Sequence, residues 1–296
     1  MPGAHVTVPA GLARWRGEPG GAEWLDRLPT IVAELAELWS LRIGEPFAGS
    51  NVSWVAPVEL PQWAHAVLKI NFPERESEHE ADALVHWRGD GAVRPYLSDS
   101  ERRALVVERC EPGTTLWDLR DEEEANTVAA GVLRRLWRRV PDDHPFALLA
   151  DAAAGWAEEL PDRWARAGGP FERSLLDEAV SFLREAGPTQ REPVVCHQDF
   201  HGGNVLRSTR EAWLAIDPKP LVGEREFDTA SLLRDRRWEL RAEPHPERRI
   251  RRRLDQLASG LDLDRERMRG WGIAHALAWD PDEDMIACAR WLAAAR

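Results

Sequence analysis

The spacing of the apolar residues changes near residue 110, and this change limits the fold more than any other feature of the sequence. From Leu41 to Glu108, apolar residues form short segments bounded by turn residues, a pattern typical of β-strands. After Gly113 they recur mainly at helical spacing. We therefore expect an α+β fold with a strand-rich first part, residues 1–110, and a mostly helical second part, residues 111–296.

The same pattern places the individual elements. In the first part, strands are expected on either side of the turn 47–53 and at 64–70, 93–97 and 104–108, with helices at 20–40 and 74–88. In the second part, helices are expected at 114–120, 122–140, 143–159, 171–186, 225–240, 245–258 and 263–293, and short strands at 193–196 and 213–216.

Composition excludes several classes of protein. The net charge of −12 argues against a nucleic-acid binder, which needs a basic surface to neutralise phosphates, and it suits a cationic substrate. The three cysteines form no CxxC pair, which argues against a disulfide framework and a cysteine zinc site and fits a reducing cytoplasm. The N-terminus does not resemble a signal peptide, and no run of about 18 apolar residues predicts a membrane span.

The run from His197 to Asn204, together with Asp217, carries the strongest chemical signal. A hairpin of the strand-like segments between Asn204 and Asp217 would bring these two side chains together. Their oxygens suit Mg²⁺, a hard cation that is held by few carboxylates together with phosphate oxygens. Asp199 would lie nearby and could accept a proton from an attacking hydroxyl, which is the arrangement that phosphoryl transfer requires.

Two features of the first part complete this arrangement. Lys69 lies in an expected strand like the lysine of the kinase pattern V-A-I-K, and Glu80 on the acidic helix is the carboxylate that we expect to pair with it. Between the first two strands lies a loop of small residues that would let backbone N–H groups approach phosphates. Its candidate binding residues are Ser50, Asn51 and Ser53.

A second interpretation belongs to another class of enzyme. His197, Asp199 and His201 alternate along the chain and would lie on one side of an extended segment, as the ligands of a zinc or iron metallohydrolase would. This interpretation leaves Lys69 and Asp217 without a role. A P-loop kinase is excluded, because that motif needs Gly-Lys followed by Ser or Thr and no lysine of this chain follows a glycine.

The sequence resembles the aminoglycoside-phosphotransferase-like kinases, and within them the streptomycin 6-phosphotransferase and hydroxyurea phosphotransferase branch. The resemblance is carried by the runs at 54–58, 66–69, 80–84, 108–114 and 213–223, of which Ile216-Asp217-Pro218-Lys219-Pro220 is the most specific to the branch. It implies a bilobal protein-kinase-like fold, with an antiparallel sheet plus helix in the N-terminal nucleotide-binding lobe and a mostly helical C-terminal lobe for catalysis and substrate binding.

The resemblance also implies roles for single residues. Asp199 would be the catalytic base, and Asn204 and Asp217 would bind Mg²⁺. Lys69, paired with Glu80, would contact the ATP phosphates. The backbone of Glu108 to Cys110 would bond to the adenine edge, and Asp228 would brace the catalytic region. Gln198 departs from the commoner His-Gly-Asp pattern, because it stands where the family usually has glycine.

The resemblance further implies an enzyme that phosphorylates a hydroxyl of a cationic small molecule, in the first place streptomycin, and so gives antibiotic resistance. We expect a monomer or weak dimer. Hydroxyurea, a capreomycin-like peptide and a sugar metabolite remain alternatives. Substrate contacts are expected from Trp279, Asp280, Glu283 and Asp284, because carboxylates pair with guanidinium groups and tryptophan faces attract cations. The same acidic residues would also suit the start of a helix.

Overall fold

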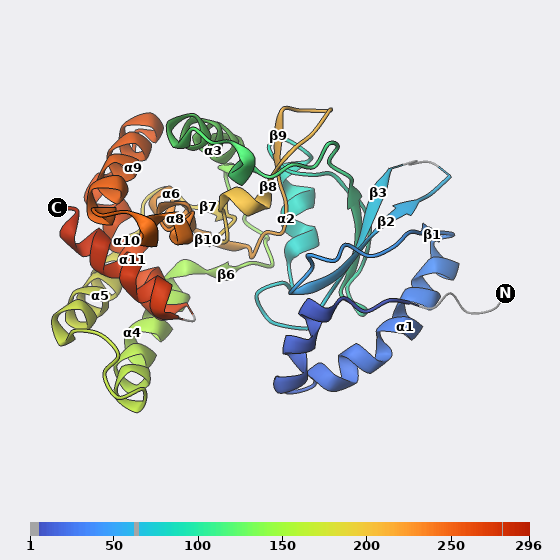
Figure 1. Ribbon diagram of the computed structural model, residues 1–296, viewed down its shortest axis with the longest axis horizontal. Coiled ribbons are helices and arrows are strands. Elements are labelled where there is room, and N and C mark those ends of the chain that lie inside the picture. The colour runs from blue at the N-terminus through green and yellow to red at the C-terminus, as the bar shows by residue number, and fades with distance from the viewer. Residues whose placement is uncertain (1–5, 62–64, 280) are drawn as a thin grey trace. The chain divides into compact units, whose positions relative to one another are not determined.

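The computed structural model describes residues 6–61, 65–279 and 281–296 (Figure 1). The chain divides into two compact units. Unit 1 consists of Met1–Gly89 and Val93–Glu111, and unit 2 consists of Asp90–Ala92 and Pro112–Arg296. Unit 1 combines an antiparallel sheet with helices and unit 2 is mostly helical, so the predicted α+β class is confirmed.

Unit 1 is built on a five-stranded sheet with the order β1-β2-β3-β5-β4, in which every neighbouring pair is antiparallel. Its strands are β1 (Arg42–Ile43), β2 (Ser53–Glu59), β3 (Ala66–Asn71), β4 (Pro95–Asp99) and β5 (Ala104–Glu108). The sheet places β3, which carries Lys69, at its centre.

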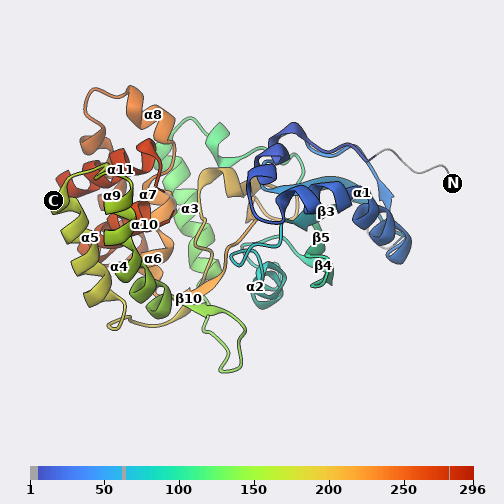
Figure 2. The same ribbon diagram turned by 90° about the horizontal axis from the view of Figure 1, so that it is seen from below.

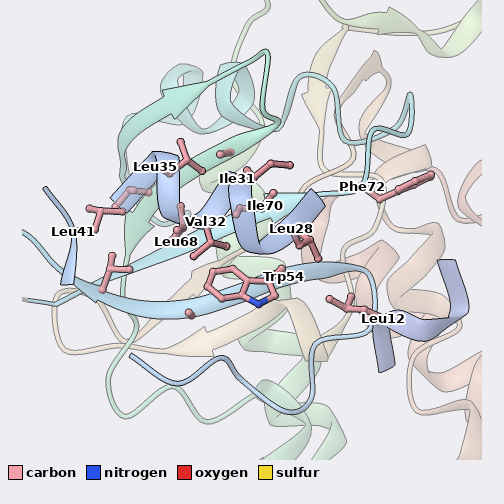
Figure 3. Packing of buried hydrophobic residues seen from close by; sticks show 14 of the residues in the cluster. Leu12, Leu28, Ile31, Val32, Leu35, Leu41, Trp54, Leu68, Ile70 and Phe72 are labelled. Carbon is pink, nitrogen blue, oxygen red and sulfur yellow. The ribbon is translucent and has the colours of Figure 1, made fainter. Parts of the chain in front are cut away.

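One face of this sheet is covered by the N-terminal helices η1 (Ala10–Gly17) and α1 (Gly21–Leu38). The apolar side of α1, including Leu28 and Leu35, packs on β2 and β3 residues such as Trp54 and Leu68 (Figure 3). Because side chains alternate along a strand, Leu68 and Ile70 point into this core while Lys69 points to the opposite face. The core therefore fixes the direction in which Lys69 projects.

The opposite side carries α2 (Glu80–Trp87), which is shorter than the helix expected at 74–88. Residues 74–79 form turns instead, and the Ser77 hydroxyl lies within hydrogen-bonding distance of the carbonyl oxygens of Phe72 and Glu74. A serine that bonds to nearby backbone in this way competes with helical hydrogen bonding. The helix consequently begins at Glu80, whose side chain lies in its first turn.

Unit 2 contains a bundle of helices and two small sheets (Figures 1 and 2). Its helices are η2 (Leu116–Asp118), α3 (Glu122–Leu136), α4 (Leu149–Arg166), α5 (Arg173–Ala186), η3 (Gly202–Asn204), α6 (Arg225–Asp228), α7 (Ala230–Leu233), α8 (Arg237–Ala242), α9 (Pro246–Leu261), α10 (Arg265–Ala278) and α11 (Glu283–Ala294). Its strands are β6 (Ala147–Leu148), β7 (Val194–Cys196), β8 (Val205–Arg207), β9 (Trp213–Ala215) and β10 (Leu221–Gly223). The sheets are β6-β10-β7 and the hairpin β8-β9.

Two expected helices of unit 2 are interrupted. The helix expected at 263–293 is two helices, α10 and α11, because Pro281 follows the end of α10 and Asp282 begins α11 by accepting a hydrogen bond from the backbone N–H of Met285. The helix expected at 225–240 is three short ones, with Arg236 in the left-handed region at φ 54° before α8. None of the described helices is long and apolar enough to cross a membrane.

Candidate active site

In unit 1, Lys69 and Glu80 form a buried ion pair. The Lys69 ammonium donates to both carboxylate oxygens of Glu80 at 2.7 Å, and the two side chains are only 9% and 3% exposed. The sequence pattern predicted this contact. A lysine cation held in place by a carboxylate at the centre of a sheet can contact a phosphate without losing its position.

Sequence reasoning missed Asn71, which joins the same group. Its amide nitrogen donates to Glu80 Oε2 at 2.7 Å, and its amide oxygen accepts from the Ser53 hydroxyl at 2.6 Å. The sheet register pairs Ser53 with Asn71, and Asn71 shares a strand face with Lys69. In the sequence, the sign of this role was that Asn71 follows Lys69 by two positions, which places both side chains on the same face of a strand.

The other candidate nucleotide contacts lie elsewhere in unit 1. Ser50 and Asn51 form the loop before β2 and lie against Gly11 of η1, where a Cβ would come within 2.1 Å of the Asn51 amide oxygen. Glu108 ends β5, and its backbone N–H donates to the Arg94 carbonyl at 2.8 Å. Cys110 is half-buried and forms no disulfide.

In unit 2, the loop after β7 places Asp199. Gln198 adopts a left-handed backbone at φ 64°, and the Asp199 N–H bonds to the His197 carbonyl at 2.8 Å, which closes a tight turn. Two groups hold this turn: Asp228 accepts from the Gln198 N–H at 2.8 Å, and the Ser231 hydroxyl donates to the Gln198 carbonyl at 2.8 Å. Glycine is the usual residue at positive φ, so Gln198 occupies a position that favours glycine.

The β8-β9 hairpin brings Asn204 and Asp217 together, as predicted. The Ile216 N–H donates to the Asn204 carbonyl at 2.9 Å, directly beside Asp217. The Asn204 amide nitrogen donates to the Asp199 carbonyl at 3.0 Å and lies 3.4 Å from its carboxylate. This bond turns the amide oxygen of Asn204 away from Asp199. An amide oxygen and the carboxylate of Asp217 are hard oxygen donors, the kind that Mg²⁺ prefers.

Burial controls the charges around this cluster. Burial raises the pKa of Asp199, an effect that His201 opposes and Asp217 reinforces. Burial raises the pKa of Asp228 to about 6, although the Gln198 N–H opposes the shift. Burial lowers the pKa of His197 to about 4, which keeps the imidazole neutral at pH 7.

The metallohydrolase interpretation is not supported. The Nε2 of His197, which is fully buried, donates to the Ile216 carbonyl at 2.9 Å, and the Nδ1 of His201 accepts from the Gly203 N–H at 3.1 Å. These contacts direct the two rings to different partners. Within residues 6–61, 65–279 and 281–296, no group of three or more His, Cys, Asp or Glu side chains is arranged to hold a metal ion.

The acidic segment at the start of α11 already has partners. Glu283 lies 3.7 Å from Arg241, and Asp284 also pairs with Arg241. Trp279 directly follows α10, with its ring centroid 4.6 Å from that of His275, and Asp280 lies outside the described residues. The segment therefore starts a helix and binds arginine, and any cationic ligand would compete with Arg241 for these carboxylates.

Sequence reasoning also missed Trp117 and Asp235, which contact the catalytic loop. One carboxylate oxygen of Asp235 accepts from the Trp117 indole N–H at 2.6 Å, and the other accepts from the Gly202 N–H at 2.8 Å. The only local signal was the pair Gly202-Gly203, because adjacent glycines allow another group to approach the backbone closely.

Comparison with known proteins agrees with this geometry. The family profile described as aminoglycoside/hydroxyurea antibiotic resistance kinase matches residues 39–280. Streptomycin 6-kinase of Streptomyces griseus is 36% identical over 96% of this chain and 94% of its own length. Hydroxyurea phosphotransferase of Kitasatospora aureofaciens is 35% identical over 96% of this chain and 83% of its own.

Solved structures show the same fold at lower identity. A thermostable variant of aminoglycoside phosphotransferase APH(4)-Ia, in a ternary complex with AMP-PNP and hygromycin B, superposes with a TM-score of 0.60 at 14% identity. The match covers 90% of this chain and 96% of that one. The fold is therefore that of the protein-kinase-like small-molecule kinases. The chain belongs to the aminoglycoside/hydroxyurea antibiotic resistance kinase family and is a phosphotransferase that uses ATP.

Proposed function

We propose that this protein phosphorylates a hydroxyl of a streptomycin-type aminoglycoside and thereby confers resistance to it. The observation that carries the proposal is the cluster of Asp199, Asn204 and Asp217 in unit 2, which has the composition that phosphoryl transfer requires. The likeness to streptomycin 6-kinases over nearly the whole chain supports the choice of acceptor. The net charge of −12 favours a cationic acceptor.

The proposed roles follow from the contacts. Asp199 orients the acceptor hydroxyl and takes its proton, while the hydroxyl oxygen forms a bond to the γ-phosphorus of ATP. The bond from that phosphorus to the β–γ bridging oxygen breaks, and ADP leaves. Asn204 and Asp217 would hold Mg²⁺, which when bound offsets the charge of the phosphate oxygens.

Residues 1–110 form the proposed nucleotide-binding lobe, which is unit 1 apart from residues 90–92 and residue 111. Lys69, kept in place by Glu80, contacts the phosphates of ATP. Ser50 and Asn51 in the loop and Ser53 at the start of β2 are the proposed phosphate contacts, and the backbone from Glu108 to Cys110 is proposed to bond to the adenine edge. Residues 111–296 form the proposed catalytic and substrate-binding lobe.

Replacement of Asp199 tests the chemical step. We expect Asp199→Ala to lower kcat for streptomycin by about 10²–10⁴-fold, the range for loss of a general base, while calorimetry shows that ATP still binds. Asp151→Ala, at an exposed aspartate of α4, is the matched control. Full activity of Asp199→Ala would contradict the assignment of the base.

Hydroxyurea is the second candidate acceptor, because a hydroxyurea phosphotransferase matches the chain at 35% identity over 96% of its length. A panel of streptomycin, other cationic antibiotics and hydroxyurea, assayed for ADP formation, separates the candidates. ADP formation with hydroxyurea but not with streptomycin would overturn the first choice.

The cellular setting is part of the proposal. A kinase that draws on ATP is expected in the cytoplasm, and the three cysteines, none of which is in a disulfide, agree with that compartment. We propose that the protein acts as a monomer or weak dimer. Light scattering at micromolar concentration measures this directly.

A further inference from the structure

Three aromatic rings from separate parts of unit 2 contact one another in a row that ends next to Asp199, and we name them the aromatic corner: Trp238, Trp117 and His201. Trp117 stacks on His201, with ring centroids 5.2 Å apart and planes inclined by 8°. Trp238 meets Trp117 edge to face at 4.9 Å and 89°. The Nε2 of His201 lies 3.7 Å from the Asp199 carboxylate, so the corner begins at the proposed catalytic base.

Buried polar groups hold the corner in one geometry. Asp235 binds the Trp117 indole N–H and the Gly202 N–H with separate carboxylate oxygens. Arg236 is 5% exposed and donates to the carbonyl oxygens of Leu116 and Leu119, at 3.1 and 2.5 Å. Since Arg236 precedes α8, these bonds tie η2, which carries Trp117, to α8, which carries Trp238.

The two glycines of the catalytic loop leave space for the Trp117 ring. A Cβ on Gly202 would lie 2.6 Å from Trp117 Cδ1, and a Cβ on Gly203 would lie 2.5 Å from Trp117 Cη2. Cβ atoms of non-glycine residues do not come this close to other atoms, so a side chain at either position would displace the Trp117 ring or the loop. The loop that carries Asp199 and the ring of Trp117 are therefore packed in direct contact.

The side chains of the aromatic corner are partly exposed to solvent, although buried hydrogen bonds hold the segments that carry them. Trp238 is 53% exposed, and the side chains of His201 and Asp199 are 28% and 25% exposed. Arg237, next to Trp238, lies 3.6 Å from Asp282, which offsets its charge. A large aromatic side chain that packs against an anchored ring, yet is half exposed, offers a face to which a cation can bind.

We propose that the aromatic corner binds a guanidinium or ammonium group of the acceptor, with Trp238 as a specificity-determining residue. The cation lies against the Trp238 face while a hydroxyl of the same molecule reaches Asp199. This inference rests on the proposed function, because it assumes a cationic acceptor phosphorylated at that carboxylate.

Variants that keep or remove the aromatic face test the inference. Trp238→Leu should raise KM for streptomycin by about 2–30-fold, the range expected for loss of a cation–π contact, with a smaller change in kcat. Trp238→Phe keeps a ring and should stay closer to the wild type. Trp164→Leu, at a half-buried tryptophan of α4, is the matched control, and thermal unfolding checks that each variant is folded.

The outcomes separate the two proposals. A wild type that phosphorylates streptomycin, with KM of Trp238→Leu within twofold of its value, overturns the corner alone. Equal increases in KM for the Leu and Phe variants would also overturn cation binding by the ring. Calorimetric titration with streptomycin measures Kd without turnover, and a wild type that neither binds nor phosphorylates it overturns both proposals.

Discussion

Replacing Glu80 by glutamine should destabilise unit 1 strongly, because it leaves the Lys69 ammonium without its carboxylate in a buried position. The two side chains are 9% and 3% exposed and meet through two contacts of 2.7 Å. Removing one partner of a buried pair costs about 3–5 kcal/mol, whereas a surface pair contributes about 0–1 kcal/mol. Typical domains are stable by only about 5–15 kcal/mol, so the effect should be large.

The free energy of unfolding is measured by urea titration, followed by circular dichroism and by tryptophan fluorescence. Glu34→Gln is the matched control, because Glu34 pairs with Arg102 at 2.9 Å in the same unit but is 50% exposed. It should change the free energy of unfolding by less than about 1 kcal/mol.

A double variant tests the reason for the loss. Lys69→Met combined with Glu80→Leu removes both charges and should recover most of the stability, because apolar pairs of similar size often replace buried ion pairs without loss. Asn71 then loses its carboxylate partner, which leaves a deficit of about 1–3 kcal/mol. A change below about 1 kcal/mol in Glu80→Gln, or a double variant as unstable as the single one, would refute the reasoning.

Two further predictions concern the turn that carries the proposed base. Gln198 has φ 64°, so Gln198→Val should lose about 1–2 kcal/mol of stability, because a β-branched side chain is more crowded there than glutamine, whereas Gln198→Gly should stay within about 1 kcal/mol of the wild type; equal losses in urea unfolding would contradict this. The second prediction is a pH dependence. Burial lowers the pKa of His197 to about 4, so the neutral imidazole makes its full contribution to the free energy of unfolding above pH 6.5. This contribution is lost as the pH falls toward 4, by about 3 kcal/mol in all. Burial raises the pKa of Asp228 to about 6, and its effect on stability runs in the opposite direction. Ionisation of Asp228 destabilises the folded state above pH 6, and this destabilisation disappears as the pH falls toward 3.8. Asp228→Asn removes the opposing effect, so between pH 6.5 and 4 its free energy of unfolding should fall more steeply than that of the wild type; parallel curves would contradict the opposed shifts.

The sequence predicted the elements whose signals are local. The helix over residues 20–40, the strands of unit 1 and the β8-β9 hairpin each have a clear apolar period, and the structure contains them. Pro281 was the available sign that residues 263–293 could not form one helix, but the apolar spacing on both sides outweighed it. The short strands β6 and β10 have too few residues to show a period.

The site was predictable where its residues belong to one motif. Asp199, Asn204 and Asp217 are joined by a short hairpin, so their proximity follows from local structure. Trp117 and Asp235 are 118 positions apart, and no local pattern connects them. The spacing from Lys69 places Asn71 on the same strand face, but its contact with Ser53 follows only from the register between β2 and β3.

The burial of two thiols has a practical consequence. Burial raises the pKa of Cys196 well above its ordinary value and that of Cys288 to about 11, so both remain protonated and shielded from reagents. Cys110 is only half-buried. A mild alkylating reagent should therefore label the native protein at this single position, without any engineering of the other cysteines. Because Cys110 also belongs to the segment proposed to bond adenine, the rate of its modification becomes an optical or mass-spectrometric reporter of nucleotide occupancy.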